Sequence, residues 1–287
     1  MFKYRNHTLL LFIPVLLAGL SCQRAHSEQQ TNIHVPDSLT ANIDTVIVDK
    51  IVDKIVEKTE DTTSIPLDLE YIMGRFDPAK HPDFVIIADQ YADKKGMYLR
   101  KDTYKAFIAM YEHAKKDGVN LQIRSATRNF YSQKSIWEAK WSGARTIEGG
   151  ENLSVTTPDP KERALKILRY SSMPGSSRHH WGTDIDLNNL ENDWFNEGEG
   201  LTMYNWLKKH ASEYGFCQVY SAGRPYGYFE ERWHWSYTPV SAKLTAYAKA
   251  HLKNEMIDGF LGSESAPMID IVKHYVLGIN EACNHTD

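Results

Sequence analysis

The chain has 287 residues, 42% of them hydrophobic, and a formal net charge of −4 at pH 7. This composition is ordinary for a globular protein, and without a leader and a linker the length suits one domain of roughly 200 residues. The small negative charge and the lack of a Lys/Arg cluster argue against a nucleic-acid partner, which a basic surface would bind.

The first residues of the chain are typical of an export signal. Two basic residues precede an apolar stretch over 9–20, shorter than the roughly 20 residues that a membrane-spanning helix needs. Small residues then lead into Cys22, as in a bacterial lipobox, although Gly19 stands where a larger aliphatic residue is more usual. We expect residues 1–21 to be a signal peptide of the lipoprotein type and Cys22 to carry a lipid. The exported protein would then be anchored to a membrane and face the periplasm or cell surface; plain secretion after cleavage near Ser21 is the alternative.

Residues 22–65 predict a flexible stalk. The segment beyond Cys22 is polar and has no aromatic residue, so it cannot build a core. It contains a four-residue repeat, IVDK-IVDK-IVEK, over 47–58. A short self-associating helix is an alternative for the repeat, but three copies are few for a stable coiled coil. We expect a spacer between the membrane and the folded domain.

The folded domain is expected over 66–287. Within it, apolar residues recur every three or four positions from Tyr104 to Ala114, the spacing of an amphipathic helix, and Gly118 follows its end. Such patterns give, in chain order, a helix over 100–116, a strand over 119–123, helices over 132–141 and 161–170, a strand over 183–187, a helix over 203–214, strands over 216–220 and 232–237, and helices over 242–252 and 269–276. Their mixed order, without regular βαβ alternation, predicts an α+β domain: a small, largely antiparallel sheet flanked by helices.

Residues 142–159 form a polar, glycine-rich segment between two of the predicted helices. A lid over a binding cleft and a plain surface loop both fit this composition. The sequence does not choose between them.

The other cysteines of the chain are Cys217 and Cys283, an even pair once Cys22 is lipidated. In an oxidising compartment a disulfide between them would tie the C-terminal tail to the core. Two unpaired, buried thiols are the alternative.

Two short segments carry residues suited to metal chemistry: PGSSRHHWGTDIDL over 174–187 and EERWHW over 230–235. Catalytic zinc takes three protein ligands and keeps a fourth position open. A histidine before the bend at Gly182 and an aspartate on the following strand would deliver two ligands, and His234 a third from another strand. The neighbouring Glu231 is then placed to accept a proton from water.

Spacing alone leaves the first two ligands open. His179 and His180 are alternatives, as are Asp184 and Asp186. A histidine near an aspartate is also commonly just a hydrogen-bonded pair, and the bare pattern does not exclude that interpretation.

Taken together, the segments resemble the zinc D-alanyl-D-alanine carboxypeptidases of the VanY type, relatives of the lysostaphin, D-Ala-D-Ala peptidase and hedgehog metal-binding fold. The likeness covers roughly residues 95–240. Three elements carry it in the family's order: Ser125, Arg128 and Gln133; Ser177, His179, Gly182 and Asp186; and Glu231, Trp233 and His234. Tyr226-Gly227-Tyr228, just before the last element, also follows the family pattern.

The resemblance implies a division of roles. His179, Asp186 and His234 would bind Zn²⁺, and Glu231 would be the general base that activates water and then protonates the leaving amine. Arg128 would neutralise a terminal carboxylate or the developing oxyanion, because a planar guanidinium pairs with a carboxylate through two hydrogen bonds. The further substrate-binding residues would be Gln133, Ser177 and Trp233. The neighbours that lack the family spacing are His180 and Glu230.

The chain departs from the family at two positions. Arg178 stands where the family commonly has Glu, and Asp184 where it has Ala. Alternation along a strand puts Asp184 on the same face as Asp186, so Asp184 competes as a ligand. We expect it instead to hydrogen-bond a ligand or to pair with Arg178.

The resemblance implies an enzyme, a zinc metallopeptidase that hydrolyses peptidoglycan stem peptides. The expected reaction is that of a D,D-carboxypeptidase releasing terminal D-Ala. An L,D-carboxypeptidase or an endopeptidase of the same fold is the alternative, and a non-catalytic, zinc-stabilised cell-wall-binding module is an alternative of another class. We expect a monomer whose partners are the peptidoglycan peptide and, through Cys22, the membrane.

Overall fold

The computed structural model describes Ile65 and residues 67–284. The predicted signal peptide over 1–21, the lipid on Cys22 and the repeat over 47–58 lie outside the described residues, as does the rest of the stalk up to residue 64. The described residues belong to one compact unit, and the predicted domain boundaries stay predictions. No helix in the described part of the chain is long and apolar enough to cross a membrane.

The structure contains helices and short strands in mixed order. The helices are α2 (Leu69–Ile72), α3 (Lys101–Lys116), α4 (Phe130–Trp141), α5 (Leu153–Thr156), α6 (Pro160–Ile167), α7 (Gly198–His210), α8 (Thr238–His251) and α9 (Ser265–Ile269). The strands are β1 (Phe84–Ile86), β2 (Tyr98–Arg100), β3 (Ile123–Ser125), β4 (Asp184–Leu187), β5 (Phe216–Gln218) and β6 (His234–Tyr237). Short helical turns that the site and its surroundings use are η2 (Glu148–Gly150), η3 (Arg178–Trp181), η5 (Ala211–Tyr214), η7 (Val272–Val276) and η8 (Glu281–Asn284).

The main sheet is antiparallel, with the strand order β3-β4-β6-β5, and β1 and β2 form a separate antiparallel pair. Ser125 of β3 pairs with Asp186 of β4, and Asp186 pairs with His234 of β6. The predicted α+β domain with a small antiparallel sheet is confirmed.

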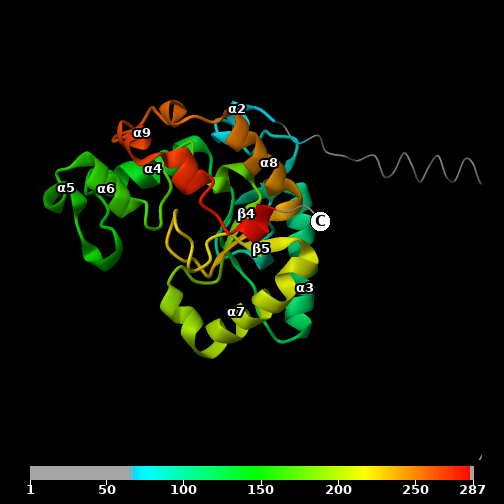
Figure 1. Cartoon of the computed structure of the whole chain (residues 1–287). Coiled ribbons are helices and arrows are strands. Elements are labelled where there is room, and N and C mark those ends of the chain that lie inside the picture. Colours follow the sequence, from blue (N-terminus) through cyan, green and yellow to red (C-terminus); the bar gives the residue numbers. More distant parts are fainter. Residues whose placement is uncertain (1–64, 66, 285–287) are drawn as a thin grey trace, which may run out of the picture. The chain divides into compact units, whose positions relative to one another are not determined.

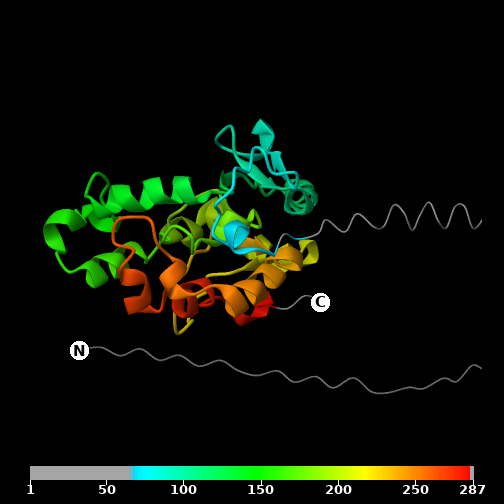
Figure 2. The same ribbon diagram turned by 90° about the horizontal axis from the view of Figure 1, so that it is seen from above.

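One face of the main sheet is apolar and the other carries polar side chains. Ile185 and Trp235 point to one face, where they share an apolar cluster with residues of α3 and α7. Because side chains alternate along a strand, Asp186 and His234 point to the other face. On that side α4, α5 and α6 extend away from the sheet and α8 packs beside the C-terminal segment (Figures 1 and 2). The polar face of the sheet is therefore the one that carries Asp186 and His234.

The predicted strand over 119–123 is wrong in position, since the observed strand is β3. Val119 and Leu121 are buried, which explains the apolar alternation. The backbone of residues 120–122 is instead held by Asn188: its side-chain oxygen accepts from Gln122 N and its amide donates to Asn120 O, both at 2.8 Å. These side-chain bonds, with the backbone bond from Asn188 N to Gln122 O, take the place of a regular strand ladder here.

The predicted helix over 269–276 is also wrong as a single element. The chain forms α9, reverses at Asp270, which has a left-handed φ of 54°, and continues as the π-helical turn η7. Ile271 and Val276 are nonetheless buried in the core, as expected for a segment that packs on the domain.

The other predicted helices and strands are confirmed with shifted ends. The helices α4, α7 and α8 begin earlier than predicted; Asn129 caps α4 by accepting from Ser132 N at 2.9 Å. The strands β4, β5 and β6 are shorter than predicted. Gly118 follows the end of α3, as expected, with a φ of 78°, and Gly215 follows the end of α7–η5 with a φ of 76°.

A disulfide joins Cys217 of β5 to Cys283 of η8, with the two Cα atoms 5.6 Å apart. Of the two alternatives for these cysteines, the structure has the bridge. It ties the C-terminal tail to the edge strand of the main sheet.

Candidate active site

Three predicted ligands meet on the polar face of the sheet. His179 lies in η3, whose end at Gly182 has a left-handed φ of 70°. This bend leads directly into β4, where Asp186 faces His234 of β6. Ligand atoms of His179, Asp186 and His234 lie within 4.8 Å of one another, and all three side chains are buried. Gly182 is required, because a Cβ there would lie 2.4 Å from the Phe84 ring.

Hydrogen bonds fix which nitrogen each histidine presents. Nδ1 of His179 lies 2.9 Å from the carbonyl oxygen of Ala126, which can only accept, so Nε2 keeps its lone pair. Nε2 of His234 lies 2.9 Å from Oδ2 of Asp184, so Nδ1 is the free nitrogen. These two free nitrogens lie 3.3 Å and 3.0 Å from the carboxylate oxygens of Asp186.

The arrangement suits a divalent metal. Oδ1 of Asp186 is buried and has no hydrogen-bond partner among the described residues, although it lies 3.0 Å from the free Nδ1 of His234. Two acceptors facing each other at this distance are repelled unless a proton or a cation lies between them. Two imidazoles and one carboxylate are also a ligand set that catalytic zinc sites use.

His180 lies outside the metal site. Its Nδ1 lies 2.6 Å from the carbonyl oxygen of Arg128, and its Nε2 accepts from Gly175 N at 3.0 Å. Burial lowers its pKa to about 3, so the ring is neutral. Both nitrogens are used to hold the loop around the site.

Asp184 supports His234 rather than competing with Asp186. Besides His234, it accepts from Arg178 Nε at 3.1 Å, and both side chains of that pair are fully buried. Burial opposes ionisation of Asp184, but the charge of Arg178 outweighs it and holds the pKa of the carboxyl below its usual range. The two departures from the family pattern, Arg178 and Asp184, are thus partners of each other.

Glu231 lies beside the ligands, with Oε2 3.4 Å from Nδ1 of His234. It is buried, and burial raises its pKa while His234 opposes the rise. Glu230, the neighbouring glutamate, is half-buried and forms an ion pair with Arg232, whose Nε lies 3.4 Å from Oε2 of Glu230. Of these two glutamates, Glu231 lines the cleft in which the three ligands lie and Glu230 does not.

Arg128 extends over the site from the loop after β3. Its guanidinium donates to the hydroxyl of Ser125, and Nη1 lies 3.7 Å from Oδ2 of Asp186. Its Nε donates to Oε1 of Gln133 at 2.9 Å, while the amide of Gln133 donates to the carbonyl of Ser172 at 2.8 Å. Gln133 is buried and both of its polar ends have partners, so its geometry is that of a residue that orients Arg128.

The cleft has a volume of about 330 Å³. Trp233 lines it and packs on Tyr170 and Phe195. Ser177 is buried outside the lining, and its hydroxyl has no hydrogen-bond partner in the described part of the chain. The lining is formed by Arg128, Gln133, Ile136, Lys140, Arg145, Glu148, Tyr170, Ser171, Ser172, His179, Asp186, Leu190, Glu191, Asn192, Tyr220, Tyr228, Glu231, Trp233 and His234.

Several lining residues were not predicted. Lys140 shares a face of α4 with Gln133 and Ile136, so the helical spacing from Gln133 would have indicated it. Arg145 and Glu148 come from the segment 142–159, which therefore borders the cleft. Nothing in their local sequence indicated this, because the loop is placed by the packing of α4 and α6.

A buried His-His-Asp cluster with an adjacent glutamate and an overhanging arginine defines a site of the metallopeptidase class. A family model described as "VanY: D-alanyl-D-alanine carboxypeptidase" matches residues 96–240, just over half of the chain. The chain belongs to this family of carboxypeptidases. The predicted family is confirmed.

Two curated relatives match parts of the chain. "Putative carboxypeptidase YodJ" of Bacillus subtilis is 27% identical over 175 residues, which are 59% of this chain and 57% of the relative. An "Uncharacterized protein" of Haemophilus influenzae is 33% identical over 78 residues, which are 26% of this chain and 53% of the relative. The chain spans about half the length of the curated relatives it matches.

Solved structures with a similar fold include an LD-carboxypeptidase, LdcB, with 22% identity and a TM-score of 0.45; the match covers 67% of this chain and 79% of that one. The vancomycin resistance D,D-pentapeptidase VanY, in a mutant form in complex with Zn(II), has 20% identity and a TM-score of 0.41, over 63% of this chain and 93% of that one.

Proposed function

We propose that the chain is a zinc-dependent peptidoglycan carboxypeptidase that releases the terminal D-Ala from pentapeptide stems. The observation that carries the proposal is the convergence of His179 Nε2, His234 Nδ1 and the Asp186 carboxylate beside the buried Glu231. The description of the family supports the D,D specificity.

In this proposal the side chains divide the work. When bound by His179, Asp186 and His234, zinc supplies a Lewis acid that acidifies water and polarises a carbonyl. Glu231 accepts a proton from the attacking water and delivers it to the leaving amine of D-Ala. The reaction is a direct hydrolysis, in which one C–N bond breaks and one C–O bond forms, without a covalent enzyme intermediate.

Arg128 supports removal of the last residue of a peptide. Its side chain is a quarter exposed and lines the cleft, and its guanidinium is fixed by Ser125 and Gln133. A fixed guanidinium binds a carboxylate through two hydrogen bonds, and the carboxylate next to the last peptide bond of a stem peptide is that of its C-terminal residue. This favours a carboxypeptidase over an endopeptidase.

The test is incubation of the chain with defined muropeptides, with and without a chelator. We expect chelator-sensitive release of D-Ala from pentapeptide and none from tetrapeptide. Release from tetrapeptide alone would identify an L,D-carboxypeptidase, and cleavage of cross-linked dimers an endopeptidase. If no muropeptide is cut, the enzymatic proposal fails and a non-catalytic binding module is left.

Glu231→Gln gives the sharper test of mechanism. The variant keeps the shape of the side chain but cannot accept the proton, so kcat should fall by at least about 100-fold while zinc content is unchanged. Glu230→Gln, one residue away and paired with Arg232, is the matched control and should keep its activity. Equal activity of the two variants would show that Glu231 is not the general base.

We also propose that the protein is exported and anchored to a membrane through lipid on Cys22. Support comes from the apolar stretch over 9–20 and the small residues before Cys22. Labelled palmitate should be incorporated in cells that produce the chain but not in those that produce Cys22→Ala. Labelling of both proteins, or of neither, would contradict the anchor.

A further inference from the structure

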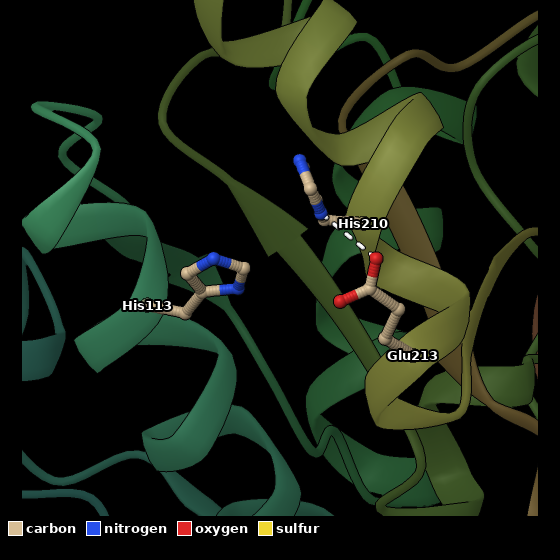
Figure 3. Close-up of side chains that lie close together, drawn as sticks. All are labelled: His113, His210 and Glu213. Atoms are coloured by element: carbon tan, nitrogen blue, oxygen red, sulfur yellow. Dashed lines mark hydrogen bonds and ion pairs between the residues drawn. The ribbon is translucent and has the colours of Figure 1, made fainter. Parts of the chain in front are cut away.

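A second group of metal-ligating side chains lies apart from the catalytic site, at the ends of two helices. His113 is in the last turn of α3, His210 is the last residue of α7, and Glu213 follows in η5. One ligand atom from each lies within 4.8 Å of the other two. Figure 3 shows His113 on its own helix, facing His210 and Glu213 across the helix junction. None of the three lines the catalytic cleft.

We propose that His113, His210 and Glu213 form a second divalent-metal site, selective for zinc-like ions, that links α3 to α7. The ligand types carry the choice of ion, because two imidazoles and a carboxylate suit Zn²⁺ whereas Ca²⁺ and Mg²⁺ take oxygen ligands.

The contact between His210 and Glu213 is already close to that of two ligands on one ion. Nδ1 of His210 lies 2.9 Å from Oε1 of Glu213, and ligands bound at about 2.0 Å around a tetrahedral ion are about 3.3 Å apart. A metal that replaces the proton between these two atoms needs only a small movement. The Glu213 side chain is 53% exposed and is free to make it.

His113 is held by partners on both sides of its ring. Nδ1 lies 2.8 Å from the hydroxyl of Tyr214, and Nε2 lies 3.4 Å from Oδ2 of Asp117. In the tautomer whose Nδ1–H donates to the tyrosine oxygen, Nε2 keeps a lone pair for a metal. Asp117 is itself held by Trp206, whose Nε1 donates to Oδ2 at 2.8 Å, and is a candidate for the fourth ligand.

Negatively charged groups lie close to the three ligands. The α3 and α7 helices both end at the site, and a helix C-terminus carries a partial negative charge. The carboxylates of Glu213 and Asp117 add two full negative charges beside His210 and His113. The same turns carry four lysines, Lys115, Lys116, Lys208 and Lys209, and the ammonium groups of Lys115 and Lys208 lie over the rings of Tyr111 and Tyr204.

A metal at this junction would stabilise the side of the domain that supports the catalytic sheet. Phe107 of α3 and Leu207 of α7 share an apolar cluster with Ile185 of β4. A ligand that binds only the folded state stabilises it as its concentration rises above Kd. A Tm rise of about 5 to 10 °C is expected at a hundredfold excess of Zn²⁺ over the Kd of this site.

The experiment counts zinc on the full chain after removal of metal and dialysis against Zn²⁺. We expect two ions per chain for the wild type and one for His210→Ala/Glu213→Gln. His251→Ala, an exposed histidine on α8, is the matched control and should keep two. The proposal is overturned if the double variant retains as many ions as the wild type.

Two further measurements test whether the second zinc ion binds at this site. In a His179→Ala/His234→Ala background, one ion should remain and should disappear when the His210 and Glu213 changes are added, which separates this site from the catalytic one. Glu213→Gln alone changes an exposed side chain, so its metal-free Tm should match the wild type while the zinc-induced rise shrinks. An undiminished rise in Glu213→Gln would contradict the site.

Discussion

At the scale of single residues, the site depends on side chains that hold the ligands in place. Asp184 is the clearest case, because it accepts hydrogen bonds from both His234 and Arg178. The first bond fixes the ring so that Nδ1 faces Asp186. The second balances a guanidinium that is fully buried.

Asp184→Asn should therefore weaken two properties at once. Zinc affinity should fall by about 10- to 100-fold, as for other partners of metal-ligating histidines. The free energy of unfolding should fall by about 3 kcal/mol, because the buried charge of Arg178 loses its counter-ion. Competition with a chelating dye and urea denaturation measure the two effects.

The matched control for Asp184→Asn is Asp93→Asn. Asp93 pairs with Arg124 at 2.6 Å, but the arginine side chain is 40% exposed. Solvent screens such a pair, so its loss should cost at most about 1 kcal/mol and leave zinc binding unchanged. Equal destabilisation by both variants would show that burial of the Asp184 pair is not the cause.

Gln133 provides a second test at this scale. Gln133→Met keeps the volume of the side chain but removes the bond to Arg128 Nε. If Arg128 binds the substrate carboxylate, KM should rise roughly 10-fold, corresponding to about 1.4 kcal/mol, with kcat and zinc content little changed. Steady-state kinetics on pentapeptide measure this. The same change at Gln122, away from the cleft, is the control, and a fall in kcat alone would contradict an orienting role.

At the scale of elements, Gly182 joins η3 to β4 and so sets the distance between His179 and Asp186. It combines a φ of 70° with closely packed neighbours: an added Cβ would lie 2.4 Å from Phe84 Cε1 and 2.9 Å from Arg100 Cγ. Both neighbours are buried. The turn therefore tolerates no side chain.

Gly182→Ala should destabilise the fold by about 2 to 4 kcal/mol, from backbone strain and steric conflict together, and should lower activity. Gly96→Ala is the control, since Gly96 has a φ of 78° and nothing within 4 Å of an added Cβ. Gly96→Ala should lower the free energy of unfolding only through the strained left-handed backbone, by about 1 kcal/mol. Thermal denaturation compares them, and equal losses would show that the contact with Phe84 is not decisive.

Elements with a strong local signal could be predicted from the sequence, and weakly marked ones could not. The α3 helix shows its apolar spacing from Tyr104 to Ala114, and Gly118 marks its end. The β1–β2 pair has strands of three residues each, too short for a periodic pattern. The backbone of residues 120–122, where a strand is wrongly predicted, is held by Asn188, more than sixty residues away in the sequence. A local sequence pattern cannot indicate such a long-range hydrogen bond.

The candidate site was predictable in its residue types but not in its surroundings. The match of three elements to the family pattern selects His179 and Asp186 from one element and His234 from another, and strand pairing brings them together. The role predicted for Gln133 stays a prediction, because substrate contact and orientation of Arg128 leave the same trace in a sequence. Arg145 and Glu148 reach the cleft only through the packing of the loop that carries them.

At the scale of the whole molecule, the C-terminal tail closes the domain against the edge strand β5. Asn280 N donates to Val219 O at 2.9 Å, and its side chain donates to Gln218 O at 3.1 Å. The disulfide between Cys217 and Cys283 lies at the same place. The tail thus covers the edge of the sheet that carries His234 one strand further in.

The bridge should account for much of the stability of the domain. It joins residues separated by 66 positions, and closing a loop of that length restricts the unfolded chain by about 4 kcal/mol in the chain-entropy account. Urea denaturation of the wild type with and without a reductant should therefore give midpoints that differ clearly. Cys217→Ala/Cys283→Ala, the control, should match the reduced wild type and ignore the reductant. Superimposable curves for the oxidised and reduced wild type would mean that hydrogen bonds from Asn280, and not the bridge, hold the tail against β5.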